Sequence, residues 1–276
     1  MGIALALGAS LTWGLADFFG PLQGRVLGAL RTLVYVQVGG LAGIALIVAV
    51  RAAGPADAVA LLAIPAALSG TLGLFAYYRG IAVGAISIVA PVAGVSAVVP
   101  VVVGIASGES PSVWQLAGIA CALVGVFLAA LEPRSDRETR LAAGFGLAVL
   151  AAIGFGGYFP FMHAAGNADF WWAALIFRIT STAVILLAVA ARRPGVRVPL
   201  RILPWLALIG CGDMFGNLLF AAASTSGLVS ITSVLASLYP IVTVVLARLV
   251  LAERVARSQE AGIVLTLAGV ALISAG

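Results

Sequence analysis

The stretch ESPSVWQLAGIACALVGV, residues 109–126, returns 144 positions later as ERVARSQEAGIVLTLAGV, residues 253–270. Eight of the eighteen positions are identical in the two copies, including the polar pairs Glu109/Glu253 and Gln115/Gln259. Because the shift is close to half of the 276 residues, the chain is predicted to consist of two related units. The predicted units are residues 1–131 and 141–276, and the charged stretch 132–140, EPRSDRETR, is predicted to link them.

Composition indicates the class of protein. Hydrophobic residues make up 63% of the chain and charged residues 9%, which excludes a water-soluble domain and is typical of a multi-pass membrane protein. Lipid permits only helices or a closed barrel, and strand-like alternation is absent, so an all-α fold is predicted. A crossing helix needs about 20 apolar residues. Ten transmembrane helices are predicted, over residues 2–20, 31–50, 58–78, 81–106, 113–131, 142–162, 170–191, 202–223, 228–251 and 258–275.

The number of helices in each unit predicts the symmetry. Each unit has five predicted helices, an odd number, so the second unit must enter the membrane from the opposite side. Such inverted repeats build carriers that work by alternating access, with a binding site near the middle of the bilayer.

Several motifs resemble one family of carriers. They are Leu-Thr-Trp-Gly at Leu11–Gly14, Leu30-Arg31, Ser-Ile-Val-Ala-Pro at Ser87–Pro91, and the Gly-Glu-x-x-x-x-x-Gln-x-x-Gly-Ile signature of Gly108–Ile119, which returns from Glu253. Together they resemble the EamA-type, ten-helix members of the drug/metabolite transporter superfamily over essentially the whole chain. The resemblance implies a bacterial exporter of amino acids or similar small metabolites in the cytoplasmic (inner) membrane. Members of the family usually place both termini in the cytoplasm.

The arginines predict a different orientation. All fifteen basic residues are arginines, and most are expected in loops, where membrane topology explains them better than nucleic-acid binding. Arg51 stands almost alone on the side of the termini. The positive-inside rule therefore places both termini outside. Loops after odd-numbered helices carry Arg25, Arg134, Arg137, Arg140, Arg192, Arg193, Arg197, Arg201, Arg254 and Arg257.

Charged residues within the predicted helices are candidate functional groups, because an ionised side chain at the bilayer centre costs roughly 2.5–3.5 kcal/mol. Asp213 is expected at a similar depth to Arg178, and Asn217 lies one turn beyond Asp213 on the same face. Asp213 and Arg178 are therefore expected either to form a structural ion pair or to serve transport. In the second case Asp213 titrates or binds the ammonium group of a substrate, with Asn217 as a hydrogen-bond donor. Arg178 is also a candidate for locking a gate.

Two further features suggest gating. Asp17 is expected either to pair with a loop arginine such as Arg79 or to line the mouth of the cavity. Pro91 and Pro240 each remove a backbone donor within a predicted helix, which predicts a kink and a possible hinge.

Aromatic side chains are predicted to enclose the solute, or else to form an interfacial belt. Ser237 shares a helical face with Ser230 and Ser233, so its hydroxyl is a candidate for the polar part of the solute. In carriers resembling this one, the helices that hold the aromatic candidates surround the central cavity. Those candidates are Trp13, Tyr77, Tyr78, Phe155, Tyr158 and Tyr239.

An enzyme is not expected. His163 is the only histidine, and the chain lacks a His-Glu-x-x-His motif, a phosphate-binding loop and any recognisable metal or cofactor site. A polyspecific exporter of cationic drugs, using Asp17 or Asp213, is the main alternative, and a channel is a further one. The expected partners are a small-molecule substrate and the lipid bilayer, without nucleic acid. A monomer is expected, since two fused units complete the inverted pair, with a dimer as the alternative.

Overall fold

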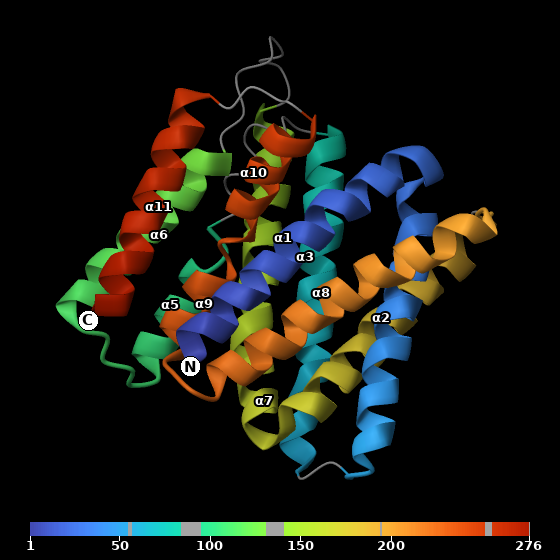
Figure 1. Cartoon of the computed structure of the whole chain (residues 1–276), viewed down its shortest axis with the longest axis horizontal. Helices are drawn as coiled ribbons and strands as arrows, with labels where there is room; N and C mark the ends of the chain where they lie inside the picture. Colours follow the sequence, from blue (N-terminus) through green and yellow to red (C-terminus); the bar gives the residue numbers. More distant parts are fainter. Residues whose placement is uncertain (55–56, 84–94, 131–140, 194, 252–255, 276) are drawn as a thin grey trace.

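The computed structural model describes residues 1–276 apart from 55–56, 84–94, 131–140, 194, 252–255 and 276. Within the described part every regular element is a helix (Figure 1). Seven helical spans in the described part, one of which joins α9 to α10, are long and apolar enough to cross a membrane. An all-helical, multi-pass membrane protein is therefore confirmed, whereas the count of ten crossings stays a prediction. The elements are α1 Gly2–Leu27, α2 Ala29–Arg51, η1 Ala58–Leu62, α3 Ala63–Val83, α5 Val98–Ala106, α6 Val113–Ala130, α7 Leu141–Arg192, η3 Leu200–Ile202, α8 Leu203–Ser224, α9 Val229–Ala236, α10 Tyr239–Leu251 and α11 Arg257–Ala275.

Helix α7 contains two of the predicted spans. Its backbone leaves the helical region at Asp169, where φ is −163° and ψ is 106°. The Asp169 carboxylate accepts hydrogen bonds from the backbone N–H of Trp171 at 2.9 Å and of Trp172 at 3.2 Å. This side chain therefore caps a new helix, so the first segment of α7 (141–168) and its second segment (170–192) are treated separately below.

The predicted span 228–251 is divided as well. Helix α9 ends at Ala236 and α10 begins at Tyr239, which leaves Ser237 and Leu238 between two short helices. Pro240 is the second residue of α10, a position where the missing N–H removes no intrahelical bond. The chain thus breaks just before Pro240, while Pro91 lies outside the described residues.

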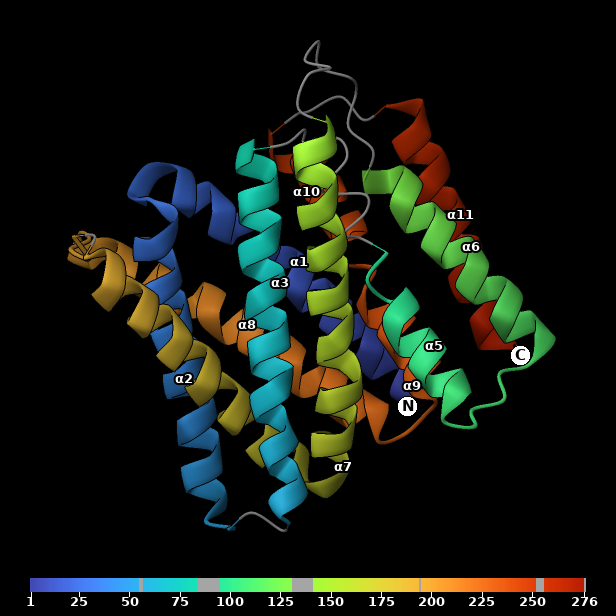
Figure 2. The same ribbon diagram turned by 180° about the vertical axis from the view of Figure 1, so that it is seen from behind.

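Glycines set the closest helix contacts. A Cβ at Gly154 would lie 2.5 Å from the Cα of Gly73, so only glycine permits the packing of α3 against the first segment of α7. A Cβ at Gly118 would lie 2.7 Å from the carbonyl oxygen of Gly269, between α6 and α11. Both pairs of helices lie side by side in the two opposite views (Figures 1 and 2). The glycine ridges of α6 and α11 therefore dock against each other.

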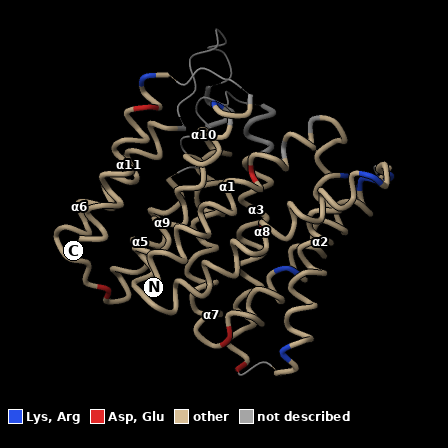
Figure 3. The backbone as a smooth tube through the Cα atoms, in the orientation of Figure 1, with Lys and Arg blue, Asp and Glu red and all other residues tan. Residues whose placement is uncertain are grey.

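Both termini lie at the same end of the bundle (Figure 1). The turn between α7 and α8 and the neighbouring ends of α10 and α11 lie away from that end and carry basic residues, coloured blue in Figure 3. We call the end that holds the N- and C-termini the terminal end and the other the arginine-rich end.

Candidate functional site

A cavity of about 410 Å³ lies between the helices. Residues from α1, α2, α3, α6, α7, α8, α10 and α11 line it, so segments from both predicted units build its wall. Ten of the residues predicted for binding or gating lie on this wall: Trp13, Asp17, Tyr77, Phe155, Tyr158, Arg178, Asp213, Asn217, Tyr239 and Pro240.

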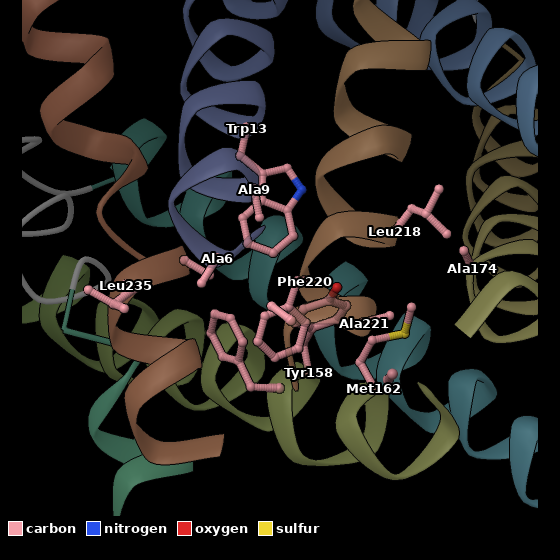
Figure 4. Close-up of a cluster of buried hydrophobic side chains, with 14 of the residues drawn as sticks. Ala6, Ala9, Trp13, Tyr158, Met162, Ala174, Leu218, Phe220, Ala221 and Leu235 are labelled. Carbon is pink, nitrogen blue, oxygen red and sulfur yellow. The ribbon is translucent and has the colours of Figure 1, made fainter. Parts of the chain in front are cut away.

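A cluster of aromatic rings forms one end of the cavity. Trp13 contacts Tyr158, Phe159 and Phe220, with ring centroids 5.9, 6.3 and 6.2 Å apart. Most of these contacts are edge-to-face or tilted, the arrangements that aromatic quadrupoles favour. Phe220 is fully buried, and Figure 4 shows Trp13, Tyr158 and Phe220 gathered between the helices. We call Trp13, Tyr158, Phe159 and Phe220 the floor of the cavity.

Glycine makes room for the floor. A Cβ at Gly216 would lie 2.5 Å from Cδ1 of the Trp13 indole, so the ring rests directly on the backbone of α8. Tyr239 meets the same indole edge-on at 6.4 Å, from the start of α10. The floor therefore depends on residues from α1, α7, α8 and α10.

The direction in which the cavity opens follows from α1. Ala6 and Ala9 are fully buried, Trp13 belongs to the floor, and Asp17, one turn further, is exposed and lines the cavity. On the face of α1 that these four residues share, exposure thus increases away from the N-terminus. The floor closes the cavity on the side of the terminal end.

Arg178 and Asp213 form a salt bridge at the cavity wall, with Nη2 and Oδ2 2.5 Å apart. The Arg178 side chain is only 1% exposed, and its Nη1 donates a hydrogen bond to Oε1 of Gln37. A Cβ at Gly40 would lie 3.2 Å from Cζ of Arg178, so glycine lets the guanidinium lie across α2. The predicted ion pair between Arg178 and Asp213 is therefore present. It joins α7 to α8, and the hydrogen bond to Gln37 adds α2.

Asp213 also faces the cavity, because its side chain is 31% exposed and belongs to the lining. The amide nitrogen of Asn217 donates to the backbone oxygen of Asp213 at 2.8 Å. Asn217 therefore lines the cavity with one of its two amide N–H groups engaged, and its role as a donor to a solute stays a prediction.

Asp17 has a different environment. Among the described side chains no hydrogen-bond or ion-pair partner is found for its carboxylate, although it lines the cavity. The side chain of Arg79, its expected alternative partner, lies outside the described residues. The position of Asp17 at the cavity is observed, and its pairing with Arg79 stays a prediction.

Three predicted residues are not on the described wall. Ser237 is buried, and its hydroxyl donates to the carbonyl oxygen of Val234 at 2.9 Å, because the chain turns there between α9 and α10. The side chain of Tyr78 and the whole of Pro91 lie outside the described residues.

Several lining residues were not singled out from the sequence. Gln37 is the most informative, since a glutamine in the middle of an apolar helix is a signal that sequence alone contains. Phe159, Phe177 and Thr243 gave no such signal, because aromatic and hydroxyl side chains are common in membrane helices. Within the described part of the chain, no group of three or more His, Cys, Asp or Glu side chains is placed to hold a metal ion.

Comparisons with known proteins agree with this architecture. The model of the EamA-like transporter family matches residues 142–275, the second half of the chain. A solved structure titled "Crystal structure of protein" superposes with a TM-score of 0.81 and 18% sequence identity, over 99% of this chain and 98% of that one. At this identity the likeness shows the fold alone. No curated protein matches the chain.

Proposed function

The chain belongs to the EamA-like transporter family, and we propose that it is a secondary carrier that exports amino acids or similar small metabolites across the bacterial cytoplasmic membrane by alternating access. The family consists of transporters of small molecules, not of enzymes. The substrate, the direction of transport and the mechanism belong to the proposal.

The cavity is the observation that carries this proposal. Its volume of about 410 Å³ lies within the range of small-molecule sites, which is roughly 300–1,000 Å³. Its wall combines aromatic rings with carboxylate and amide groups. An amphipathic solute of about the size of an amino acid would place its apolar part on the floor and its polar part near Asp17 and Asp213.

Two units related by an inverted repeat are supported by matching contacts. A Cβ at Gly14 would meet the side chain of Val242 on α10, and a Cβ at Gly156 would meet Val99 on α5 in the same way. These glycines and valines are 142 and 143 residues apart, close to the shift of 144 in the duplicated stretch. In addition, α1 packs on α8 while α3 packs on the first segment of α7, which is the exchange that the repeat requires. Counting both segments of α7 and joining α9 to α10 brings the proposed number of crossings to ten.

The orientation supports the proposed direction, export. The arginine-rich end would lie in the cytoplasm by the positive-inside rule. Because the floor closes the cavity toward the terminal end, the structure then corresponds to a carrier that loads its solute from the cytoplasm. Rearrangement of the two units would release the solute on the other side.

A cation exporter is the second candidate, and Asp17 is the observation that favours it. The carboxylate of Asp213 is already paired with Arg178, so Asp17 is the acidic group in the described wall that remains for a solute cation. A matched set of solutes separates the two candidates in proteoliposomes. Uptake of phenylalanine supports the amino-acid carrier, and uptake of phenethylamine alone supports the cation carrier. If neither these nor the other amino acids are transported, the proposed function is wrong.

A further inference from the structure

Helix α9 packs beside the part of α1 that leads from the floor toward the terminal end. All eight of its residues, Val229–Ala236, are buried, and the helix packs against α1, α5, α7 and α8. Figure 4 shows Leu235 of α9 next to Ala6 of α1, where α1 continues from the floor toward the N-terminus. A solute that leaves toward the terminal end along α1 would pass this buried helix, which we call the plug helix.

A carboxylate from the other unit holds the start of the plug helix. Glu109, in the turn between α5 and α6, accepts hydrogen bonds from the backbone N–H of Val229 at Oε1 and of Ser230 at Oε2, the second at 3.0 Å. A negative charge at a helix N-terminus is favoured both by the unpaired amides and by the helix dipole. Glu109 thereby joins the two units across 120 positions of sequence.

The backbone of α5 is shaped for this carboxylate. A Cβ at Gly104 would lie 2.9 Å from Cδ of Glu109, so any larger residue would displace the carboxylate from its place beside α9. The contact is therefore built by two positions, Gly104 and Glu109, that lie in the same unit.

The plug helix carries polar groups that have no partner in this arrangement. The hydroxyls of Ser230 and Ser233 are fully buried, and neither has a hydrogen-bond partner within the described part of the chain. A buried hydroxyl without a partner destabilises the state that contains it. Water or a solute passing along α9 would supply the missing partners, so these hydroxyls fit a passage that is closed here.

The chain also provides a place for the plug helix to move. Ser237 and Leu238 separate α9 from α10, so α9 can change its angle without bending a continuous helix. We propose that Glu109 is the latch of the gate at the terminal end. Release of Glu109 from the N-terminus of α9 lets the plug helix turn about Ser237 and Leu238, and it opens a passage lined by Ser230 and Ser233. This inference rests on the proposed alternating access.

The test measures access to the passage without any substrate. Ser233→Cys is introduced into a chain in which Cys121 and Cys211 are replaced by alanine, and the protein in nanodiscs is treated with a membrane-impermeant maleimide. The thiol is expected to react slowly, and Glu109→Gln is expected to raise its rate about tenfold, the effect of losing a charge-assisted contact. Glu260→Gln, at an exposed carboxylate paired with Arg248, is the matched control and is expected to leave the rate unchanged.

A second variant and a second thiol separate opening of the gate from a general loosening of the protein. Gly104→Ala retains the carboxylate but displaces it, so it is expected to raise the Ser233→Cys rate in the same way as Glu109→Gln. Thr243→Cys, on the cavity wall, is expected to react more slowly when the gate opens, because alternating access closes the other side. An unchanged Ser233→Cys rate in folded Glu109→Gln protein overturns the latch, as does a parallel acceleration of both thiols. A failed transport assay would instead count against the proposed carrier function. It would not affect the test of the latch, because the thiol-reaction rates are measured without substrate.

Discussion

The guanidinium of Arg178 lies between α8 and α2. Its Nη2 is 2.5 Å from Oδ2 of Asp213 on α8, and its Nη1 donates a hydrogen bond to Oε1 of Gln37 on α2. The arginine is almost completely buried, so its charge depends on Asp213. We expect Asp213→Asn to destabilise the protein by about 3 kcal/mol, because it leaves a buried charge without its partner. The measurement is thermal unfolding in detergent, followed by size-exclusion chromatography.

A double variant is the control for this ion pair. Arg178→Gln combined with Asp213→Asn removes both charges, and we expect it to be more stable than Asp213→Asn alone. Additive losses in the double variant would show that the two side chains do not stabilise each other.

Asp17 is predicted to act on transport rather than on stability. It lines the cavity and has no partner among the described side chains, so Asp17→Asn should leave the unfolding temperature nearly unchanged. For a solute with an ammonium group, we expect the KM to rise about tenfold or more, since a hydrogen bond to a charged group contributes roughly 1.5–3 kcal/mol. Asp57→Asn is the matched control, because Asp57 caps η1 far from the cavity and asparagine caps equally well. Equal KM values for all three proteins would exclude Asp17 as an anchor.

Trp13 is predicted to be needed for both folding and transport. Trp13→Ala removes the ring that contacts Tyr158, Phe159 and Phe220, and we expect a loss of roughly 3–5 kcal/mol. Trp13→Phe should recover most of the stability but transport more slowly, because it leaves a gap in the floor. Trp114→Ala, at a side chain that is 64% exposed, is the control and should behave like the parent protein. A Trp13→Ala protein with parental stability would contradict the proposed floor.

The contact of α6 with α11 is predicted to require glycine. A Cβ at Gly125 would lie 2.6 Å from the backbone nitrogen of Thr266, so Gly125→Ala should destabilise the protein by roughly 1–3 kcal/mol. Gly146→Ala on α7 is the control, since a Cβ there meets nothing within 4 Å. Thermal unfolding of the two variants compares them directly. A Gly125→Ala variant as stable as Gly146→Ala would show that the two helices are not closely packed in solution.

The sequence was sufficient for the all-helical membrane class and for many residues of the cavity wall. Charged residues are scarce in this chain, so Asp17 and Asp213 stood out, and Trp13 belongs to the Leu-Thr-Trp-Gly motif; all three line the cavity. The orientation of a helix that is apolar on all sides leaves no periodic signal. Phe177 and Thr243 were therefore missed.

Contacts between residues far apart in the chain could not be predicted from the sequence either. Glu109 was recognised only as part of a duplicated signature, because its contact with the start of α9 brings together segments far apart in the chain. Ser237 was placed on a continuous helical face, but the chain breaks between Ala236 and Tyr239. Serine and threonine bond readily to helical carbonyls, so a run of them does not predict such a break.

Counterflow in proteoliposomes tests the central claim most directly. Vesicles are loaded with a high concentration of an unlabelled solute that the screen identifies, and uptake of the labelled solute is followed from a dilute outer solution. A carrier with one cavity that is exposed to each side in turn predicts a transient accumulation of label that saturates with concentration. Flux that rises linearly with concentration and membrane voltage, without accumulation, would contradict alternating access and indicate a channel.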